Sequence, residues 1–131
     1  MIFSKLNGLG NDFVITDDRE NKYTENLDEM ARKLCHRRTG IGADGLVFVR
    51  KSETCDVRMQ IFNSDGSEAE MCGNGVRCFA KYVYDKGIFK HERMSVETLA
   101  GPMIIDLTVK DGVAVAAKVD TVSYTHLRAH E

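Results

Sequence analysis

Cys72 is the residue whose surroundings in the sequence favour chemistry most strongly. It stands directly before Gly73, Asn74 and Gly75, at the predicted start of a helix. The first N–H groups of a helix lack intrahelical partners, and the positive end of the helix dipole lies there as well. These surroundings stabilise a thiolate, and the same N–H groups bind carboxylates where glycines allow close approach. The residues alone leave two interpretations open: a catalytic thiol beside an anion pocket, or a structural cysteine before a tight turn.

The other cysteines do not suggest chemistry. The spacing 35, 55, 72 and 78 contains no C-x2-C pair, so we expect no metal site. Cys35 falls on an apolar helix face and Cys78 lies inside a nearly all-apolar helix, where a cysteine behaves as a small core hydrophobe. Cys72 is therefore the one thiol that we select as functional.

The segment GIGADG, residues 40–45, matches the glycine fingerprint of dinucleotide-binding loops letter for letter. That fingerprint needs a strand before it and a helix after it, so that the pyrophosphate meets a helix N-terminus. Here the predicted order is reversed, with a helix before the glycines and a strand after them. We interpret the segment as a glycine-rich connection and expect no nucleotide cofactor.

The elements that must position Cys72 are short strands and two helices. Apolar residues recur with helical spacing over 27–37, and a second helix of about 12 residues should end at Gly87 as its C-terminal cap. The second helix is apolar on nearly all sides, so we expect it to be buried. Alternation and turn signals predict strands at 2–6, 13–16, 46–49, 57–61, 94–98, 103–109 and 113–119. This mixture indicates an α+β domain.

Composition limits the classes of partner. The chain has 131 residues, of which 43% are apolar and 29% charged, and its net charge is -2, which is typical of one globular domain. The basic residues form no stripe, so we do not expect nucleic acid as a partner. No signal segment or membrane-spanning run is visible, and we expect a soluble cytoplasmic protein with reduced thiols.

The last eleven residues, 121–131, read TVSYTHLRAHE and do not continue the strand pattern before them. We predict that they are a non-native tail and exclude them from fold reasoning. The predicted domain therefore comprises residues 1–120.

Four segments together resemble the N-terminal half of the diaminopimelate epimerase family. They are KLNGLGNDFVITD, RRTGIGADGLV, IFNSDGSEAEMCGNGVRCFAKYV and SVETLAG, in the same order and at matching spacing. The resemblance implies a curved, mostly antiparallel sheet wrapped around a central helix, as one half of a two-domain pseudo-symmetric epimerase fold. It also implies interconversion of LL- and meso-diaminopimelate in lysine and peptidoglycan precursor synthesis, with no cofactor. The implied partner is this small molecule, not a membrane or nucleic acid, and we expect the full-length enzyme to be a homodimer.

The resemblance assigns roles to five residues. In family members one cysteine removes the Cα proton from one face of the substrate and a second cysteine delivers another proton to the opposite face, and Cys72 matches the first of these. The N–H groups of Gly73 and Asn74 match those that stabilise charge on the substrate carboxylate. Asn11 and Asn63 match positions that hydrogen-bond the substrate, and turn formation is the alternative role for each.

Two features depart from the family pattern. Some members carry Gln where this chain has Gly45, so a side-chain contact there cannot be expected. The second catalytic cysteine of the family lies in the C-terminal half, and neither Cys35, Cys55 nor Cys78 matches its motif. We therefore predict that the 131-residue chain alone cannot complete epimerisation.

Two alternatives remain at the level of sequence. A racemase of the proline or hydroxyproline type shares the fold and the paired cysteines, but its motif more often carries His where this chain has Asn74. A small binding domain would instead hold a carboxylate at the MCGNG loop without chemistry. The reactivity of the Cys72 thiol distinguishes the binding domain from the enzymes.

Overall fold

The computed structural model describes residues 2–8 and 10–120, which form eight strands and two helices. The predicted tail, 121–131, lies outside the described residues. Every predicted helix and strand is present within a few residues of its expected limits. Among the described residues, no helix is long and apolar enough to cross a membrane. The elements are β1 (Ser4–Gly8), β2 (Asn11–Asp17), α1 (Leu27–Cys35), β3 (Gly45–Arg50), β4 (Val57–Asn63), β5 (Glu68–Ala69), α2 (Gly73–Asp85), β6 (Arg93–Thr98), β7 (Gly101–Lys110) and β8 (Val113–Asp120).

The strands form one sheet in the order β1-β2-β3-β4-β6-β7-β8, with β5 paired on β4. Five of the seven pairings among the described strands are antiparallel, and the β2–β3 and β4–β6 pairs are parallel. A parallel pair needs a crossover connection, and these two crossovers contain α1 and α2. The expected α+β class with a mostly antiparallel sheet is confirmed, and the two parallel pairs are an addition that the sequence pattern did not predict.

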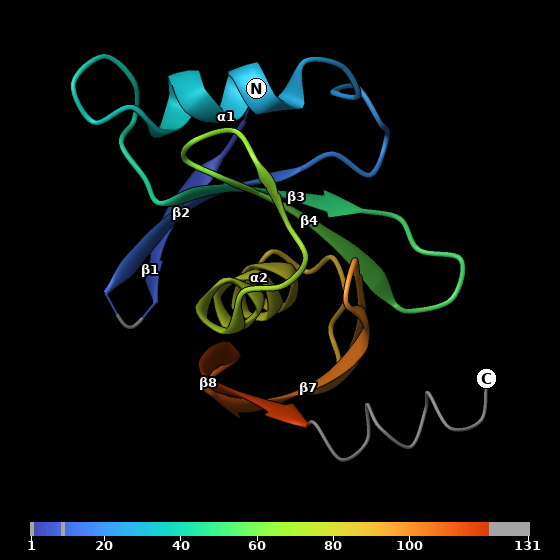
Figure 1. The fold of residues 1–131 in the computed structure, drawn as a ribbon. Helices are drawn as coiled ribbons and strands as arrows, with labels where there is room; N and C mark the ends of the chain where they lie inside the picture. Colours follow the sequence, from blue (N-terminus) through green and yellow to red (C-terminus); the bar gives the residue numbers. More distant parts are fainter. Residues whose placement is uncertain (1, 9, 121–131) are drawn as a thin grey trace.

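The two helices cover opposite faces of the sheet (Figure 1). On one face α1 packs over Leu46 and Phe48, and on the other α2 packs over the alternate residues Val47 and Val49. Successive side chains of a strand point to opposite faces, so β3 is buried at every position. In contrast, β6 alternates between more and less buried positions, because α1 packs on β3 and β4 rather than on this part of the sheet.

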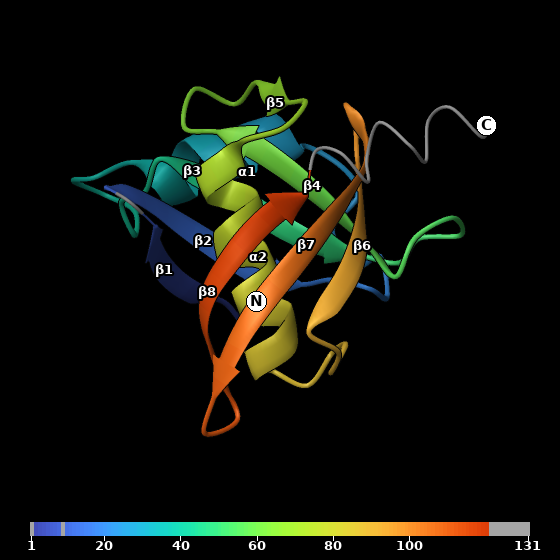
Figure 2. The ribbon, with the colours of Figure 1, turned by 90° about the horizontal axis from the view of Figure 1, so that it is seen from below.

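The sheet curls around α2, so that its two edge strands reach the helix from different sides. The helix contacts β1 and β2 toward one edge and β8 at the other, and Figure 2 shows β7 and β8 crossing over it. Two side chains of α2 form hydrogen bonds with the backbone of β8. Lys81 Nζ donates to Ala114 O at 2.7 Å, and Ala114 N donates to Asp85 Oδ1 at 2.9 Å. The expected curved sheet around a central helix is thereby confirmed.

The central helix ends where the sequence predicts. Its last carbonyls form a Schellman motif, in which Ile88 N donates to Val83 O and Gly87 N donates to Tyr84 O, both at 3.0 Å. Gly87 has φ 73°, a left-handed conformation that glycine adopts without steric cost. Lys86 is the cap residue and Gly87 follows it, so Gly87 stops the helix as expected.

Helix α1 is shorter than the predicted 27–37 because the GIGADG segment folds back onto its last turn. Ile41 N and Gly42 N donate to Leu34 O at 2.9 and 3.1 Å, and Ala43 N donates to Cys35 O at 3.1 Å. These N–H groups satisfy helix carbonyls that would otherwise lack partners. The segment connects a helix to a strand, in the predicted order.

Candidate active site

Cys72 is the N-cap of α2, where the backbone is still extended at φ −135° and ψ 119°. Its carbonyl accepts a hydrogen bond from Val76 N at 2.8 Å, and its Sγ accepts one from Gly75 N at 3.4 Å. A Cβ at residue 75 would lie 3.0 Å from Ile61 Cδ1 and 3.3 Å from Cys72 Cβ, so this position favours glycine. The half-buried thiol is therefore held against the first turn of the helix.

Gly73 and Asn74 form the first turn of α2 beside this thiol. Among the described residues their N–H groups have no hydrogen-bond acceptor, as the first N–H groups of a helix lack intrahelical partners. The first turn also contains no acidic side chain that would offset the helix dipole. The start of α2 therefore offers N–H groups and positive potential to an anion.

Asn11, the first residue of β2, lies against this helix start. Asn74 Nδ2 donates to Asn11 Oδ1 at 2.8 Å across 63 positions of sequence. Both asparagines are half-buried, and their bond joins the start of β2 to the start of α2. The structure thus brings together four of the five predicted site residues: Asn11, Cys72, Gly73 and Asn74.

Asn63, the fifth predicted residue, ends β4 and is exposed. Its Nδ2 donates to Ser67 Oγ at 3.1 Å and its backbone N donates to Ser67 O at 2.7 Å. The side chain therefore closes the turn, which is the alternative role considered for it. Asn63 still borders the cluster, because it pairs with Gly45 in the β3–β4 register, directly after Asp44.

Asp44 is the residue of this cluster that sequence reasoning missed. Its Oδ2 accepts hydrogen bonds from Asp12 N at 2.8 Å and Asn11 Nδ2 at 3.4 Å, and its Oδ1 accepts one from Arg37 Nη2 at 3.2 Å. Its backbone carbonyl accepts from Ser64 N at 3.1 Å. The only sequence signal was an acidic residue within the glycine-rich segment, and nothing in the spacing placed it beside residue 11.

The four cysteines, all within the described residues, are free thiols in different surroundings. Burial raises the pKa of the Cys35 thiol, and the nearby charge of Asp44 raises it further. Burial also raises the pKa of the Cys78 thiol, with a smaller contribution from Cys72. Cys35 and Cys78 are core residues, as predicted, and their neutral form is favoured. Within the part of the chain that the structure describes, no group of three or more His, Cys, Asp or Glu could hold a metal ion.

Gly45, where some family members carry Gln, is buried at the start of β3. A Cβ there would lie 3.1 Å from Phe62 O and 3.3 Å from Phe13 Cδ1. In this chain the position has no room for a larger side chain unless its neighbours move. Gly45 therefore contributes only backbone atoms to this part of the structure.

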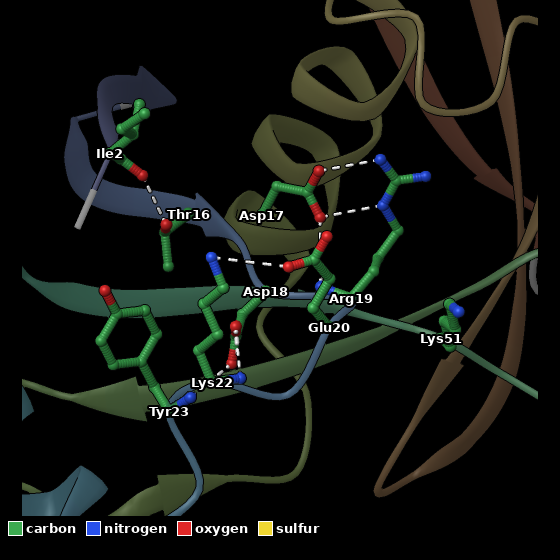
Figure 3. A pocket seen from close by; sticks show the side chains of 9 residues that line it. All are labelled: Ile2, Thr16, Asp17, Asp18, Arg19, Glu20, Lys22, Tyr23 and Lys51. Carbon is green, nitrogen blue, oxygen red and sulfur yellow. Dashed lines mark hydrogen bonds and ion pairs between the residues drawn. The ribbon is translucent and has the colours of Figure 1, made fainter.

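Figure 3 shows a cavity of about 580 Å³ that is lined by Thr16 and Asp17. These residues end β2, whereas Asn11 begins it. Four of the cavity's charged side chains pair with one another, Arg19 with Asp17 and Lys22 with Glu20. Its lining contains neither a thiol nor any of the five predicted site residues. We therefore assign the candidate site to the start of α2 and not to this cavity.

Solved structures with the same curled sheet belong to the racemase and epimerase fold class. A probable proline racemase from Agrobacterium radiobacter K84, solved with bound carbonate, has a TM-score of 0.74 and 15% sequence identity, covering 89% of this chain and 40% of that chain. A hydroxyproline epimerase from Agrobacterium vitis, solved with bound trans-4-OH-L-proline, has a TM-score of 0.71 and 12% identity, with the same coverage. These similarities establish the fold.

The chain belongs to the diaminopimelate epimerase family. The model of that family matches residues 3–126. The match extends past residue 120, and the start of a non-native tail stays a prediction. Diaminopimelate epimerase from Clostridium perfringens is 55% identical over 111 residues, which cover 85% of this chain and 41% of that protein. The enzyme from Moorella thermoacetica is 52% identical over 120 residues, covering 92% and 43%. The chain thus spans about two fifths of the length of these relatives.

Proposed function

We propose that this chain forms the N-terminal half of a cofactor-independent diaminopimelate epimerase, in which Cys72 is one of two proton-transfer thiols. The observation that carries the proposal is the position of Cys72 in a member of this family. It caps α2 two residues before Asn74, the residue whose side chain bonds Asn11. One half-buried thiol, helix N–H groups that have no acceptor among the described residues, and neutral amides therefore lie at one place.

Inversion at Cα requires a proton to leave from one face and another to arrive on the opposite face. The Cys72 thiolate takes the first proton: the C–H bond breaks, an S–H bond forms, and the electron pair is delocalised into the substrate carboxylate. A second thiol on the other face then gives up its proton to form the new C–H bond. The N–H groups of Gly73 and Asn74 stabilise the charge that develops on the carboxylate.

The asparagines Asn11, Asn63 and Asn74 supply substrate recognition in this proposal. A neutral amide donates to a carboxylate and accepts from an ammonium group, which suits a substrate that carries both charges. Asn11 and Asn74 already bond each other at the start of α2. Asn63 donates one Nδ2 hydrogen to Ser67 Oγ, and in this proposal its second Nδ2 hydrogen donates to the substrate.

The choice of substrate is tested with a chimera, in which residues 1–120 replace the matching part of the C. perfringens relative. We expect it to convert LL-diaminopimelate to the meso form and to leave trans-4-hydroxy-L-proline unchanged, measured by chiral chromatography. Conversion of hydroxyproline alone would favour the proline-type racemase. A folded chimera that binds diaminopimelate and inverts neither compound would favour a carboxylate-binding module, and either result contradicts the proposal.

The 131-residue chain alone is expected to be inactive, because it supplies one of the two thiols. Cys35 and Cys78 are buried core residues, and Cys55 does not match the family's second motif. Purified chain mixed with LL-diaminopimelate should leave its stereochemistry unchanged. Turnover that disappears in Cys72→Ala would overturn this expectation.

The proposal also covers the partner of the enzyme, its cellular compartment and its oligomeric state. The partner is a small molecule in the cytoplasm and not a nucleic acid, and the full-length enzyme is a homodimer. Four free thiols suit a reducing compartment, and a net charge of -2 offers no basic footprint for nucleic acid.

A further inference from the structure

A line of polar side chains runs from the α1–β3 loop through β2 to the start of α2. Asn11 Nδ2 donates to Asp44 Oδ2 at 3.4 Å, and Asn74 Nδ2 donates to Asn11 Oδ1 at 2.8 Å. The three residues come from three separate segments of the chain. They connect Asp44, in the α1–β3 loop, to Asn74, which lies two residues after Cys72.

The hydrogen bonds of this line all run in one direction from donor to acceptor, and Asp44 fixes that direction. A carboxylate only accepts hydrogen bonds, whereas an amide can turn over and exchange its donor and acceptor ends. Asp44 therefore requires Asn11 to present Nδ2 toward it and Oδ1 toward Asn74. Asn74 must then donate from Nδ2, and its own carbonyl oxygen is left as an acceptor.

Asp44 can impose this direction because it is itself anchored. Asp12 N donates to its Oδ2 at 2.8 Å, Asp44 N donates to Asp12 O at 2.8 Å, and Ser64 N donates to Asp44 O at 3.1 Å. Arg37 Nη2 holds the other carboxylate oxygen at 3.2 Å. The carboxylate is therefore restrained from several directions, although its side chain is partly exposed.

We infer that Asp44 is a positioning residue that fixes the donor and acceptor ends of Asn11 and Asn74 without touching the substrate. The functional meaning rests on the proposed function, in which the free oxygen of Asn74 accepts a hydrogen bond from a substrate ammonium group. By fixing the orientation of the Asn74 amide, Asp44 thus determines that this side chain offers an acceptor, which binds the ammonium group of a zwitterion and not its carboxylate.

The test compares Asp44→Asn with Asp12→Asn in the 131-residue chain. The two variants are matched, because each loses one carboxylate that Arg37 contacts, at 3.2 and 3.4 Å, and only Asp44 contacts Asn11 through its side chain. The readout is the side-chain amide signals of Asn11 and Asn74 in 15N NMR spectra. We expect Asp44→Asn to shift both pairs of signals and to speed their hydrogen exchange, and Asp12→Asn to leave the Asn74 signals in place. Unchanged Asn11 and Asn74 signals in a folded Asp44→Asn chain would overturn the inference.

A measurement on the unmodified chain covers the case in which Asp44→Asn does not fold. The side-chain amide protons of Asn74 should exchange more slowly than those of Asn26, whose side chain makes no capping hydrogen bond. Equal exchange rates would contradict the ordered line of amides.

The chimera separates this inference from the proposed function. In an active chimera, Asp44→Asn should lower kcat/KM for diaminopimelate by about 10- to 100-fold, while the alkylation rate of Cys72 and the kcat/KM of Asp12→Asn stay near those of the parent. Equal losses in the two variants would contradict a positioning role. A chimera that inverts no substrate defeats the proposed function, and the NMR result then decides the role of Asp44.

Discussion

The two ends of α2 differ in whether the chain itself supplies hydrogen-bond partners for the terminal backbone groups. At the C-terminal end, the carbonyls of Tyr82, Val83 and Tyr84 accept hydrogen bonds from the N–H groups of residues 86–88. At the N-terminal end, the N–H groups of Gly73 and Asn74 have no acceptor among the described residues. One end is closed by the chain itself, whereas the other, within the described residues, presents N–H groups without acceptors, where we propose that the substrate carboxylate binds.

The difference indicates how the fold separates stability from function. The closed end and the buried middle of α2 fix the helix inside the curled sheet, so the open end is held in place although two of its N–H groups have no acceptor among the described residues. Polar contacts from Asn11 and the thiol of Cys72 complete the open end. Substitutions should therefore lower stability most in the middle and at the closed end, and alter reactivity most at the open end.

The largest effect is expected in the middle of the helix. Phe79 is fully buried, and Phe79→Ala should lower the free energy of unfolding by about 3–5 kcal/mol, because it removes apolar contacts and leaves a cavity. Urea denaturation measures the loss. Leu99→Ala is the control, since Leu99 is 56% exposed and its loss should stay within about 0.5 kcal/mol. Similar losses in both variants would contradict a buried central helix.

The two ends are compared directly by glycine substitutions. Gly87 has φ 73°, so Gly87→Ala should lower stability by about 1–2 kcal/mol through left-handed strain. Gly73 lies within the helix, where a Cβ would approach only the flexible end of Arg77, at 3.5 Å. Gly73→Ala should therefore be nearly neutral for stability in the same urea experiment. The reverse order would disprove the contrast between the ends.

The thiols should differ in their reaction with iodoacetamide at neutral pH. Cys72 is half-buried, whereas burial raises the pKa of the Cys35 and Cys78 thiols and restricts access to them. Peptide mapping by mass spectrometry should show Cys72 modified at least about ten times faster than either of them. Faster modification of Cys78 would remove the basis for selecting the open end as the reactive one.

The smallest effect is a dependence of stability on pH. The folded-state pKa of Cys78 lies above its unfolded value, because burial disfavours the thiolate. The folded chain then binds this proton more tightly, so the contribution to stability is complete below about pH 8.5 and is lost as pH rises through the folded-state pKa. Urea midpoints at pH 7.5 and 9.5 should fall less for Cys78→Ala than for the parent. Leu99→Ala, which removes no titratable group, serves as the control and should fall as the parent does, and an equal fall in all three chains would contradict the prediction.

Local patterns were sufficient to predict most of the fold. The all-round apolar helix, its stop at Gly87 and the alternation in β4 are consequences of short-range chemistry and were confirmed. The parallel β2–β3 and β4–β6 pairs arise from packing between distant segments, and the two residues of β5 are too few to show alternation. The early end of α1 depends on hydrogen bonds from the following loop, which the helical spacing does not encode.

The site was predictable to the extent that its residues lie in contiguous motifs. Cys72, Gly73 and Asn74 follow from the MCGNG loop at a helix start. The contact of Asn11 with Asn74 spans 63 positions and needed the fold. Asp44 was missed because its partners other than Arg37 come from two distant segments, β2 and the turn after β4, and the engagement of Asn63 with Ser67 depends on the geometry of the turn.

The central claim is that the open end of α2 supplies Cys72 as one of two proton-transfer groups. The most direct test follows deuterium at Cα when the chimera inverts LL-diaminopimelate in D2O, with mass spectrometry as the readout. The account predicts one solvent deuterium at each inverted centre, and a rate that falls at least about 100-fold in Cys72→Ala but stays near the parent rate in Cys55→Ala. Inversion with deuterium uptake at the parent rate in Cys72→Ala would contradict it.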